Sequence, residues 1–159
     1  MKTKKFELTN ETVKVNGITL YRIKALKSFG NVRKGDLGGY IEREDNLSQE
    51  GRCWVYYHAK VYGNAKVCGN AKVYYEAQVY GNAKVCGNAK IEWHAQICDN
   101  AKVCGNAKVG DYAKVCDFAE IYGNAKVCDF ATVGGNAEIC DNAKVCGEAE
   151  VGYFAEVRK

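Results

Sequence analysis

Apolar and polar residues follow a strict six-residue period from Val55 onward. Seventeen consecutive hexads, residues 55–156, have Val or Ile at position one and Ala at position five. Position five of one hexad and position one of the next are two residues apart, so both side chains point to the same side of a short extended segment. The residue between them, most often Lys, points to the other side. Such a repeat predicts a solenoid, in which each unit buries its apolar residues only by stacking on its neighbours.

Positions three and four of the hexad predict the corners of this solenoid. They are most often Gly-Asn, and both residue types tolerate the positive φ that a sharp turn requires. Each hexad is therefore expected to form one short strand and one corner.

A second period, of eighteen residues, indicates three strands in each coil. One set of corners stays near the Gly-Asn consensus, as at Gly69, Gly87 and Gly105, whereas another set departs from it in every coil. The departing corners are Tyr57-His58, Tyr75-Glu76, Trp93-His94, Asp111-Tyr112, Asp129-Phe130 and Gly147-Glu148. The sequence thus predicts an all-β, three-sided solenoid with eighteen residues per coil.

The first 54 residues lack the repeat and are expected to cap the first coil. Apolar and polar residues alternate around Asn16-Gly17, which is the strongest short signal for a two-residue β-hairpin. An uncapped coil would expose its apolar interior and a row of unpaired backbone groups. Ile41 to Leu47 already spans six residues, so coiling is expected to begin before the strict repeat. We expect a hairpin cap and lead-in segment over residues 1–54 and a hexapeptide-repeat unit over residues 55–159.

The junction between these two parts resembles a known family. Its two most specific runs are Lys34-Gly-Asp-Leu-Gly-Gly-Tyr-Ile41 and Asn46-Leu-Ser-Gln-Glu-Gly-Arg-Cys-Trp-Val55. They resemble the YdcK-like hexapeptide-repeat proteins of bacteria, phages and prophages. The resemblance implies a left-handed parallel β-helix and an origin in a mobile genetic element. It supplies no catalytic residue.

Composition and charge narrow the function classes. The chain of 159 residues has no Pro and no apolar run long enough to cross a membrane. Its first residues lack the apolar core of a signal peptide, so we expect a cytoplasmic protein. The net charge of +4 lies in residues 1–54, with eleven basic and seven acidic side chains, whereas the repeat carries twelve of each. A neutral repeat argues against an acidic mimic of DNA.

One face of the predicted prism keeps its positive charge in five successive coils. Lysine occupies the outward position of the last five of the six strands that lead into the departing corners, and only Glu92 lies close enough in sequence to offset the row. Basic groups beside exposed aromatic rings suit an anionic ligand with a ring system, such as a nucleotide or a single strand. The candidate ligand-binding residues are Lys72, Lys90, Lys108, Lys126, Lys144, Tyr75, Trp93, His94 and Tyr112.

Two other interpretations of this face remain open. Lysine is the consensus residue of the repeat, so the row also fits duplication combined with solubility and protection against sheet-to-sheet association. The corner aromatics also suit contact with a protein partner, such as a host protein.

Enzymatic acyl transfer is the alternative that the resemblance raises. Many left-handed β-helices are trimeric acyltransferases with a general-base His near a loop and a cleft for a pantetheine thioester. This repeat contains no loop insertion, and its histidines, His58 and His94, stand at corners where Asn is the consensus. A general base needs an orienting partner and a pocket, so we interpret both as turn residues and expect no catalytic residue.

The nine cysteines allow three interpretations. Eight stand at position two of a hexad, and Cys53 lies in the lead-in segment. Stacked cysteines one strand apart satisfy the Cα separation of a disulfide, ~4.4 to 6.8 Å. The cytoplasmic assignment and the odd count favour free thiols. A metal site at Cys68, Cys86 and Cys104 lacks the paired spacing that brings four ligands together, so we expect neither metal nor cofactor.

The sequence therefore favours a non-enzymatic binding scaffold, an accessory protein of a phage or prophage that binds an anionic ligand or a host protein. The alternatives are an acyltransferase-like enzyme and a self-assembling structural protein. Self-association is expected because the last coil would offer an unpaired edge. The tyrosines expected to support side-by-side packing are Tyr56, Tyr62, Tyr74 and Tyr80.

Overall fold

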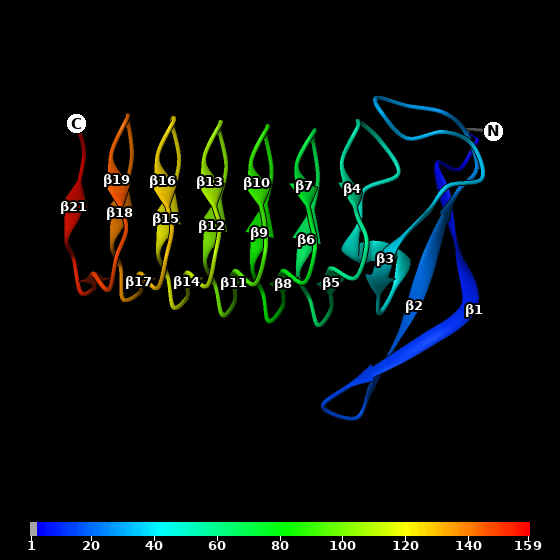
Figure 1. Cartoon of the computed structure of the whole chain (residues 1–159), viewed down its shortest axis with the longest axis horizontal. Coiled ribbons are helices and arrows are strands. Elements are labelled where there is room, and N and C mark those ends of the chain that lie inside the picture. Colours follow the sequence, from blue (N-terminus) through cyan, green and yellow to red (C-terminus); the bar gives the residue numbers. More distant parts are fainter. Residues whose placement is uncertain (1–2) are drawn as a thin grey trace.

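The computed structural model describes residues 3–159 and shows a row of stacked coils with an antiparallel hairpin at the N-terminal end (Figure 1). Each short strand pairs in parallel with the strand eighteen residues further along, as Lys90 pairs with Lys108. The strands form three sheets in this part of the chain, of nine, six and six strands. The all-β, three-sided parallel β-helix with eighteen residues per coil is confirmed.

The three faces take one two-residue strand from each coil. The first face, which we call the lysine face, contains β4 (Trp54–Val55), β7 (Lys72–Val73), β10 (Lys90–Ile91), β13 (Lys108–Val109), β16 (Lys126–Val127) and β19 (Lys144–Val145). The second face contains β5 (Lys60–Val61), β8 (Gln78–Val79), β11 (Gln96–Ile97), β14 (Lys114–Val115), β17 (Thr132–Val133) and β20 (Glu150–Val151). The third face contains β6 (Lys66–Val67), β9 (Lys84–Val85), β12 (Lys102–Val103), β15 (Glu120–Ile121), β18 (Glu138–Ile139) and β21 (Glu156–Val157).

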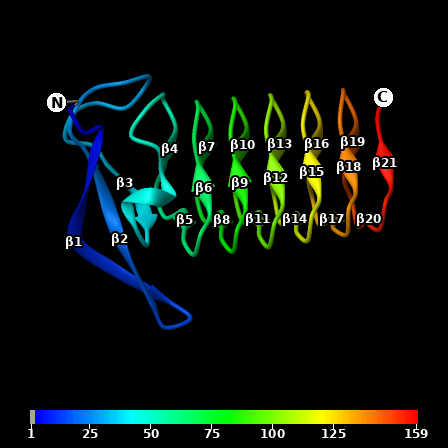
Figure 2. The same ribbon diagram turned by 180° about the vertical axis from the view of Figure 1, so that it is seen from behind.

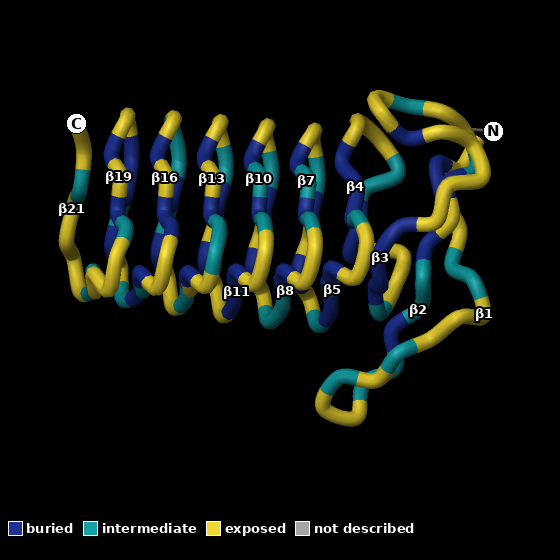
Figure 3. Tube along the Cα trace, in the orientation of Figure 1, coloured by how far each residue is buried: buried dark blue, intermediate teal, exposed yellow. Residues whose placement is uncertain are grey.

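The interior of the prism contains the aliphatic residue of position one and the alanine of position five. Both are fully buried in the central coils, as at Val103 and Ala101, while the lysine between them is exposed. Buried and exposed residues consequently alternate along every coil (Figure 3). The small alanine lets the three sheets approach closely enough for the aliphatic side chains to fill the interior.

The corners are tight turns in which position three alone has a positive φ. Gly105 has φ 64°, and its turn is closed by a hydrogen bond of 3.3 Å from the Ala107 N–H to the Cys104 carbonyl. Position four does not use this conformation in the described coils. The asparagines at position four form ladders along the rod instead, as where Asn88 Nδ2 donates to Asn106 Oδ1 at 3.2 Å.

The N-terminal hairpin is confirmed and extends the second face. Strands β1 (Phe6–Val15) and β2 (Ile18–Ala25) are antiparallel, and Asn16 and Gly17 both have the positive φ that this tight turn requires. Strand β2 pairs with β3 (Leu37–Ile41), which in turn runs parallel to β5. The hairpin therefore joins the coils through one continuous sheet, visible from both sides (Figures 1 and 2).

Coiling begins at β3, before the strict repeat, as expected. After a short 3₁₀ turn, η1 (Glu44–Asn46), Leu47 forms a parallel bridge with Val67. Buried Asn46 donates to the carbonyls of Gly63 and Ala65 at 3.1 and 2.9 Å. Within residues 3–159 we find no helix with the length and apolar character of a membrane span.

The junction residues allow the first coil to close. A Cβ added at Gly38 would lie 2.5 Å from the carbonyl oxygen of Val55, so β3 approaches that strand only because Gly stands there. Trp54 is 1% exposed and packs edge-on against Phe6 and Phe29, which cover the open end of the core. Beside them, the buried Lys5 ammonium donates to the Cys53 carbonyl at 2.9 Å. Burial lowers the pKa of Lys5.

The outer half of the hairpin packs on the second face. Leu20, Tyr40 and Tyr62 form a small apolar cluster there, with Tyr80 at its edge. Tyr62 is 6% exposed, so its ring is covered by the chain's own hairpin. The expectation that Tyr62 packs against a second copy is therefore wrong.

Candidate functional site

The lysine face places its five lysines in one unbroken row. Lys72, Lys90, Lys108, Lys126 and Lys144 pair strand to strand in register. Within the described chain none of their ammonium groups forms an ion pair or hydrogen bond. Like charges directly opposite each other on neighbouring strands are destabilising. The row therefore holds a positive potential that no carboxylate of residues 3–159 neutralises by contact.

The other two faces do not keep this charge. The third face changes from Lys66, Lys84 and Lys102 to glutamate, and Lys102 lies 3.7 Å from Glu120 at the change. On the second face Lys60 lies 3.8 Å from Glu76, and glutamines follow it. A uniform row of lysines is thus a property of the lysine face alone among the three.

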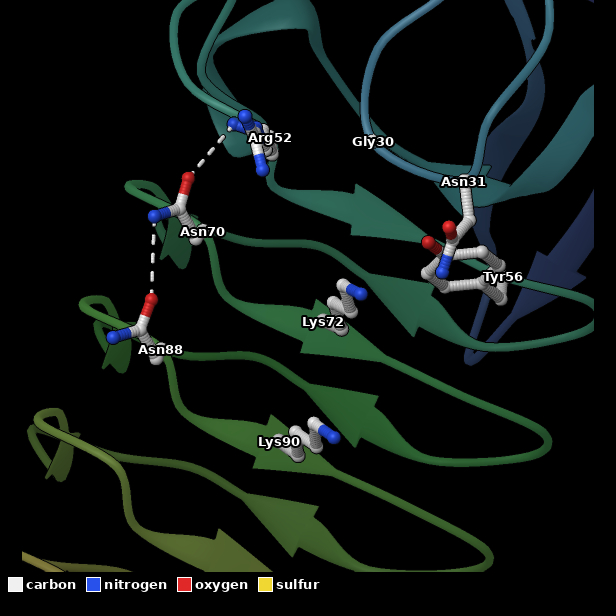
Figure 4. A pocket seen from close by; sticks show the side chains of 8 residues that line it. All are labelled: Gly30, Asn31, Arg52, Tyr56, Asn70, Lys72, Asn88 and Lys90. Carbon is white, nitrogen blue, oxygen red and sulfur yellow. Dashed lines mark hydrogen bonds between the residues drawn. The ribbon is translucent and has the colours of Figure 1, made fainter.

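A hollow at the N-terminal end of the lysine face gathers three cationic side chains, and its volume is about 300 Å³ (Figure 4). Arg52 comes from the lead-in segment, and Lys72 and Lys90 come from the first two lysine strands. The lining contains no carboxylate. Its residues are Gly30, Asn31, Arg52, Tyr56, Asn70, Lys72, Asn88 and Lys90.

An asparagine ladder forms one wall of this hollow. Asn70 Oδ1 accepts the backbone N–H of Arg52 at 3.2 Å, and Asn70 Nδ2 donates to Asn88 Oδ1 at 3.2 Å. The chain runs from Asn70 to Lys72 across Figure 4, and the next coil, with Asn88 and Lys90, lies below. Seen from outside the prism, this is the sense of a left-handed coil. The ladder fixes the spacing of the coils that carry the lysines.

The edge of the lysine face that follows each lysine strand carries two stacks of aromatic rings. Tyr57, Tyr75 and Trp93 form one stack, with centroids 5.3 and 4.2 Å apart. His94, Tyr112 and Phe130 form the other, at 4.8 and 5.2 Å. The first stack stands at position three of its hexads and the second at position four. Together they give five coils an exposed aromatic edge.

Three rings of this edge stand in a conformation that bulky residues rarely adopt. Tyr57, Tyr75 and Trp93 have φ of 57°, 60° and 59°, where most other corners have Gly or Asp; Tyr153, at a corner that follows the second face, has φ 57°. The left-handed region costs an L-residue roughly 1 to 2 kcal/mol. Backbone strain of this kind persists where the surroundings enforce it and is concentrated at functional sites.

The tyrosines behind this edge are shielded from water. Tyr56 and Tyr74 stack with centroids 4.6 Å apart. Burial raises the pKa of Tyr56 to about 12, and burial together with Glu92 raises the pKa of Tyr74. Both phenols are therefore neutral at physiological pH and add no negative charge to the lysine face.

The two histidines stand at separate corners, two coils apart. Both are exposed, and no side chain or backbone group of residues 3–159 makes a hydrogen bond to either imidazole. The His94 ring stacks on Tyr112, and the register of the coils is uninterrupted around it. The interpretation of both as corner residues fits this geometry.

The expectation of free thiols is wrong for one pair. Cys128 and Cys146 stand at position two of neighbouring lysine-face hexads and form a disulfide, with Cα atoms 4.6 Å apart. The parallel register brings them together, and that separation satisfies disulfide geometry. The other seven cysteines are free.

The thiols and carboxylates are poorly suited to holding a metal ion. Asp99, Cys116 and Asp117 lie within reach of a common point, but each carboxylate already accepts a backbone N–H, at 3.2 Å for Asp99 and 2.8 Å for Asp117. Burial raises the pKa of Cys68 and Cys86, which disfavours the thiolate that binds metal.

The candidate residues from the sequence thus lie on one side of the rod, in two rows. The lysines form the face, and Tyr75, Trp93, His94 and Tyr112 form its edge. Sequence reasoning missed Arg52 and the asparagine wall. The eighteen-residue spacing of Asn70 and Asn88 was a signal for the wall, whereas nothing in the repeat pointed to Arg52.

This architecture defines a hexapeptide-repeat β-solenoid protein with a cationic face. The chain is similar to YdcK of Escherichia coli (strain K12), a protein described as an uncharacterized acetyltransferase, at 40% identity over 57 residues. With the fold, this similarity confirms the resemblance to YdcK-like hexapeptide-repeat proteins. The matched stretch is 35% of this chain and covers only 18% of YdcK. No family model matches the chain.

Proposed function

We propose that this protein is a non-enzymatic scaffold whose lysine face binds an anionic ligand. The observation that carries the proposal is the row of five lysines in register, none of which meets a carboxylate within residues 3–159. Mutual repulsion in this row is relieved when an anion binds, so part of the binding free energy is stored in the free protein. The hollow lined by Arg52, Lys72 and Lys90 is the strongest anchor, because its lining contains three cations and no acid.

The resemblance to proteins of phages and prophages gives this activity a setting. An accessory protein with a rigid cationic face serves such an element by sequestering an anionic signal or by occupying a host protein. We place both roles on the same face, and we expect the protein to act in the cytoplasm and to self-associate.

The description of YdcK as an uncharacterized acetyltransferase favours a second candidate function, acetyl transfer. That reaction needs a base near the acceptor and a site for a thioester cofactor. The exposed His94 is the candidate base, but its ring is engaged with Tyr112 and has no orienting partner in the described chain. Binding without chemistry is therefore the stronger proposal.

Thermal unfolding with a panel of anions tests the binding function. The panel contains pyrophosphate, nucleotides, oligonucleotides and acetyl-coenzyme A, each compared with potassium chloride at equal ionic strength. A ligand at 100 times its Kd adds ~2.7 kcal/mol to the free energy of unfolding. For a chain of this size that is a rise of roughly 5 to 10 °C in Tm.

A matched pair of double variants assigns the site. Lys72→Glu with Lys90→Glu should abolish the rise in Tm. Lys66→Glu with Lys84→Glu makes the same charge change on paired strands of the third face and should leave it intact. If both double variants lose the rise in Tm equally, net charge alone explains the effect and the proposed site is contradicted. Stabilisation by acetyl-coenzyme A alone would favour the acetyltransferase candidate.

A further inference from the structure

A second hollow on the lysine face lies where one coil lacks a side chain. Position two of the successive lysine-face hexads holds Tyr56, Tyr74, Glu92, Gly110 and Cys128. Gly110 therefore leaves a hollow of about 230 Å³ between the side chains above and below it. Its lining residues are Glu92, Trp93, Lys108, Val109, Gly110, Asp111, Lys126 and Cys128.

Trp93 gives this hollow an aromatic wall. Tyr75, one coil earlier, stacks on one face of the indole with centroids 4.2 Å apart and an interplanar angle of 5°. The other face is directed to the following coil, where Asp111 stands in place of a fourth ring. The indole is 48% exposed, and a Cβ at Gly110 would lie 4.0 Å from its Cδ1. The hollow is therefore open to a flat group that stacks on Trp93.

The remaining rings of the edge leave no equivalent space between them. Tyr57 and Tyr75 are in stacking contact at 5.3 Å, and Tyr112 contacts both of its neighbours, at 4.8 and 5.2 Å. A planar ligand inserts between such pairs only by breaking them. A hollow of about 400 Å³ on the other side of the edge is lined by Tyr57, Tyr75, Trp93 and His94, but its cation, Arg22, is paired with Glu11 at 3.0 Å.

The hollow is lined by two lysines, Lys108 and Lys126, and by two carboxylates, Glu92 and Asp111. Lys108 and Lys126 have no partner among residues 3–159, so their ammonium groups are free to turn toward a ligand. Of the two lining carboxylates, Asp111 already accepts the Asp129 N–H through its Oδ2 at 3.1 Å, and Glu92 stands one coil before the two lysines.

We propose that this hollow binds a mononucleotide, with the heterocycle stacked on Trp93 and the phosphate held by Lys108 and Lys126. Base-on-aromatic stacking combined with lysines along the phosphates is the usual way proteins hold unpaired nucleotides. A free mononucleotide is favoured over a strand because only the Trp93 indole has a free ring face beside unpaired lysines, so only one base can stack there. The inference rests on the proposed anion-binding function of the lysine face and names its ligand class.

The two tryptophans make the site directly observable. Trp54 is fully buried in the cap, whereas Trp93 is exposed, so a ring stacking on Trp93 quenches only the red-shifted part of the emission. Titration with adenosine 5′-monophosphate (AMP) should give saturable quenching. Ribose 5-phosphate and adenosine, which each lack one half of the ligand, should bind at least about tenfold more weakly, a difference of about 1.4 kcal/mol.

Gly110→Tyr closes the hollow without demanding a new backbone conformation. Tyr56 and Tyr74 occupy the same repeat position, and Gly110 does not use the left-handed φ. The variant should keep its Tm and bind AMP at least about tenfold more weakly. Gly152→Tyr is the matched control, because a Cβ there meets nothing within 4 Å, and it should bind AMP as the unsubstituted protein does.

Each further outcome decides the proposal. No saturable quenching by AMP at millimolar concentration, or equal affinity in Gly110→Tyr, overturns it. Quenching by single-stranded oligothymidylate but not by AMP also overturns it, and assigns the face to strands. Stabilisation by pyrophosphate without binding of AMP leaves the proposed anion-binding function standing while this inference fails. If neither pyrophosphate nor AMP has an effect, the anion-binding function and this inference both fail.

Discussion

Substitution of Trp93 separates two opposing contributions to stability at the aromatic edge. Its φ of 59° costs roughly 1 to 2 kcal/mol compared with Gly. Its stack on Tyr75 contributes roughly 0.5 to 1.5 kcal/mol beyond area burial. Trp93→Gly removes both and also the burial of about half of the indole, roughly 2 kcal/mol, so the free energy of unfolding should fall by about 0.5 to 2.5 kcal/mol. Trp93→Ala loses the stack but keeps the left-handed backbone, so it should be ~1 kcal/mol less stable than Trp93→Gly.

Urea unfolding followed by far-ultraviolet circular dichroism measures both variants, because tryptophan fluorescence changes with the substitution itself. Ile91→Ala, in the same coil, supplies the scale of a true core loss, ~2 to 5 kcal/mol. An unchanged denaturant slope would show that the same unit unfolds in each protein. The reasoning is refuted if Trp93→Ala is as stable as Trp93→Gly, or if Trp93→Gly loses as much as Ile91→Ala.

Three further predictions concern charge, pH and the disulfide. Lys90→Glu replaces two like-charge pairs, with Lys72 and Lys108, by attractive ones and should raise Tm at low salt, at ~0.2 to 1 kcal/mol per pair. Because burial holds the folded-state pKa of Tyr56 at about 12, above the unfolded value of about 10, its contribution to stability is complete below about pH 10 and is lost as the pH rises toward about 12. Tyr56→Phe should flatten this alkaline loss in urea midpoints. Cys146→Ser opens a link between residues eighteen apart and should cost ~3 kcal/mol.

Each of these predictions has its own check. The gain in Lys90→Glu should disappear near 1 M salt, where the Debye length falls to about 3 Å, and a gain that persists there would exclude charge as its cause. A protein whose stability is flat through the alkaline range contradicts the assignment for Tyr56. Alkylation in denaturant without reductant should label seven of the nine cysteines, and labelling of all nine would show that the disulfide is absent.

The coils were predictable from the sequence because the same short pattern of buried and turn residues repeats in every hexad. Val or Ile at position one and Ala at position five occur in every hexad, and the eighteen-residue recurrence of the irregular corners fixed three sides. The hairpin followed from Asn16-Gly17 alone, since few other pairs take positive φ at both central positions. These parts needed no knowledge of contacts between distant residues.

The cap and the site depend on contacts between residues that are far apart in the sequence, and the repeat pattern does not reveal such contacts. Lys5 reaches the Cys53 carbonyl across forty-eight residues, and Arg52 lines the same hollow as Lys72 only because the lead-in segment folds beside the first coil. The disulfide escaped prediction for a different reason. The register allowed it, but an argument from the cellular compartment outweighed the geometry.

The third face has a consequence for how two rods meet. Its outward residues are lysines at Lys66, Lys84 and Lys102 and then glutamates at Glu120, Glu138 and Glu156, so the face carries a charge dipole along the long axis. Two such faces laid together in the same direction oppose like charges at every level. Turned head to tail, they match lysine with glutamate along their length. Any association through this face would therefore be directional, and an antiparallel pair with a twofold axis across the rods would be favoured over a parallel one.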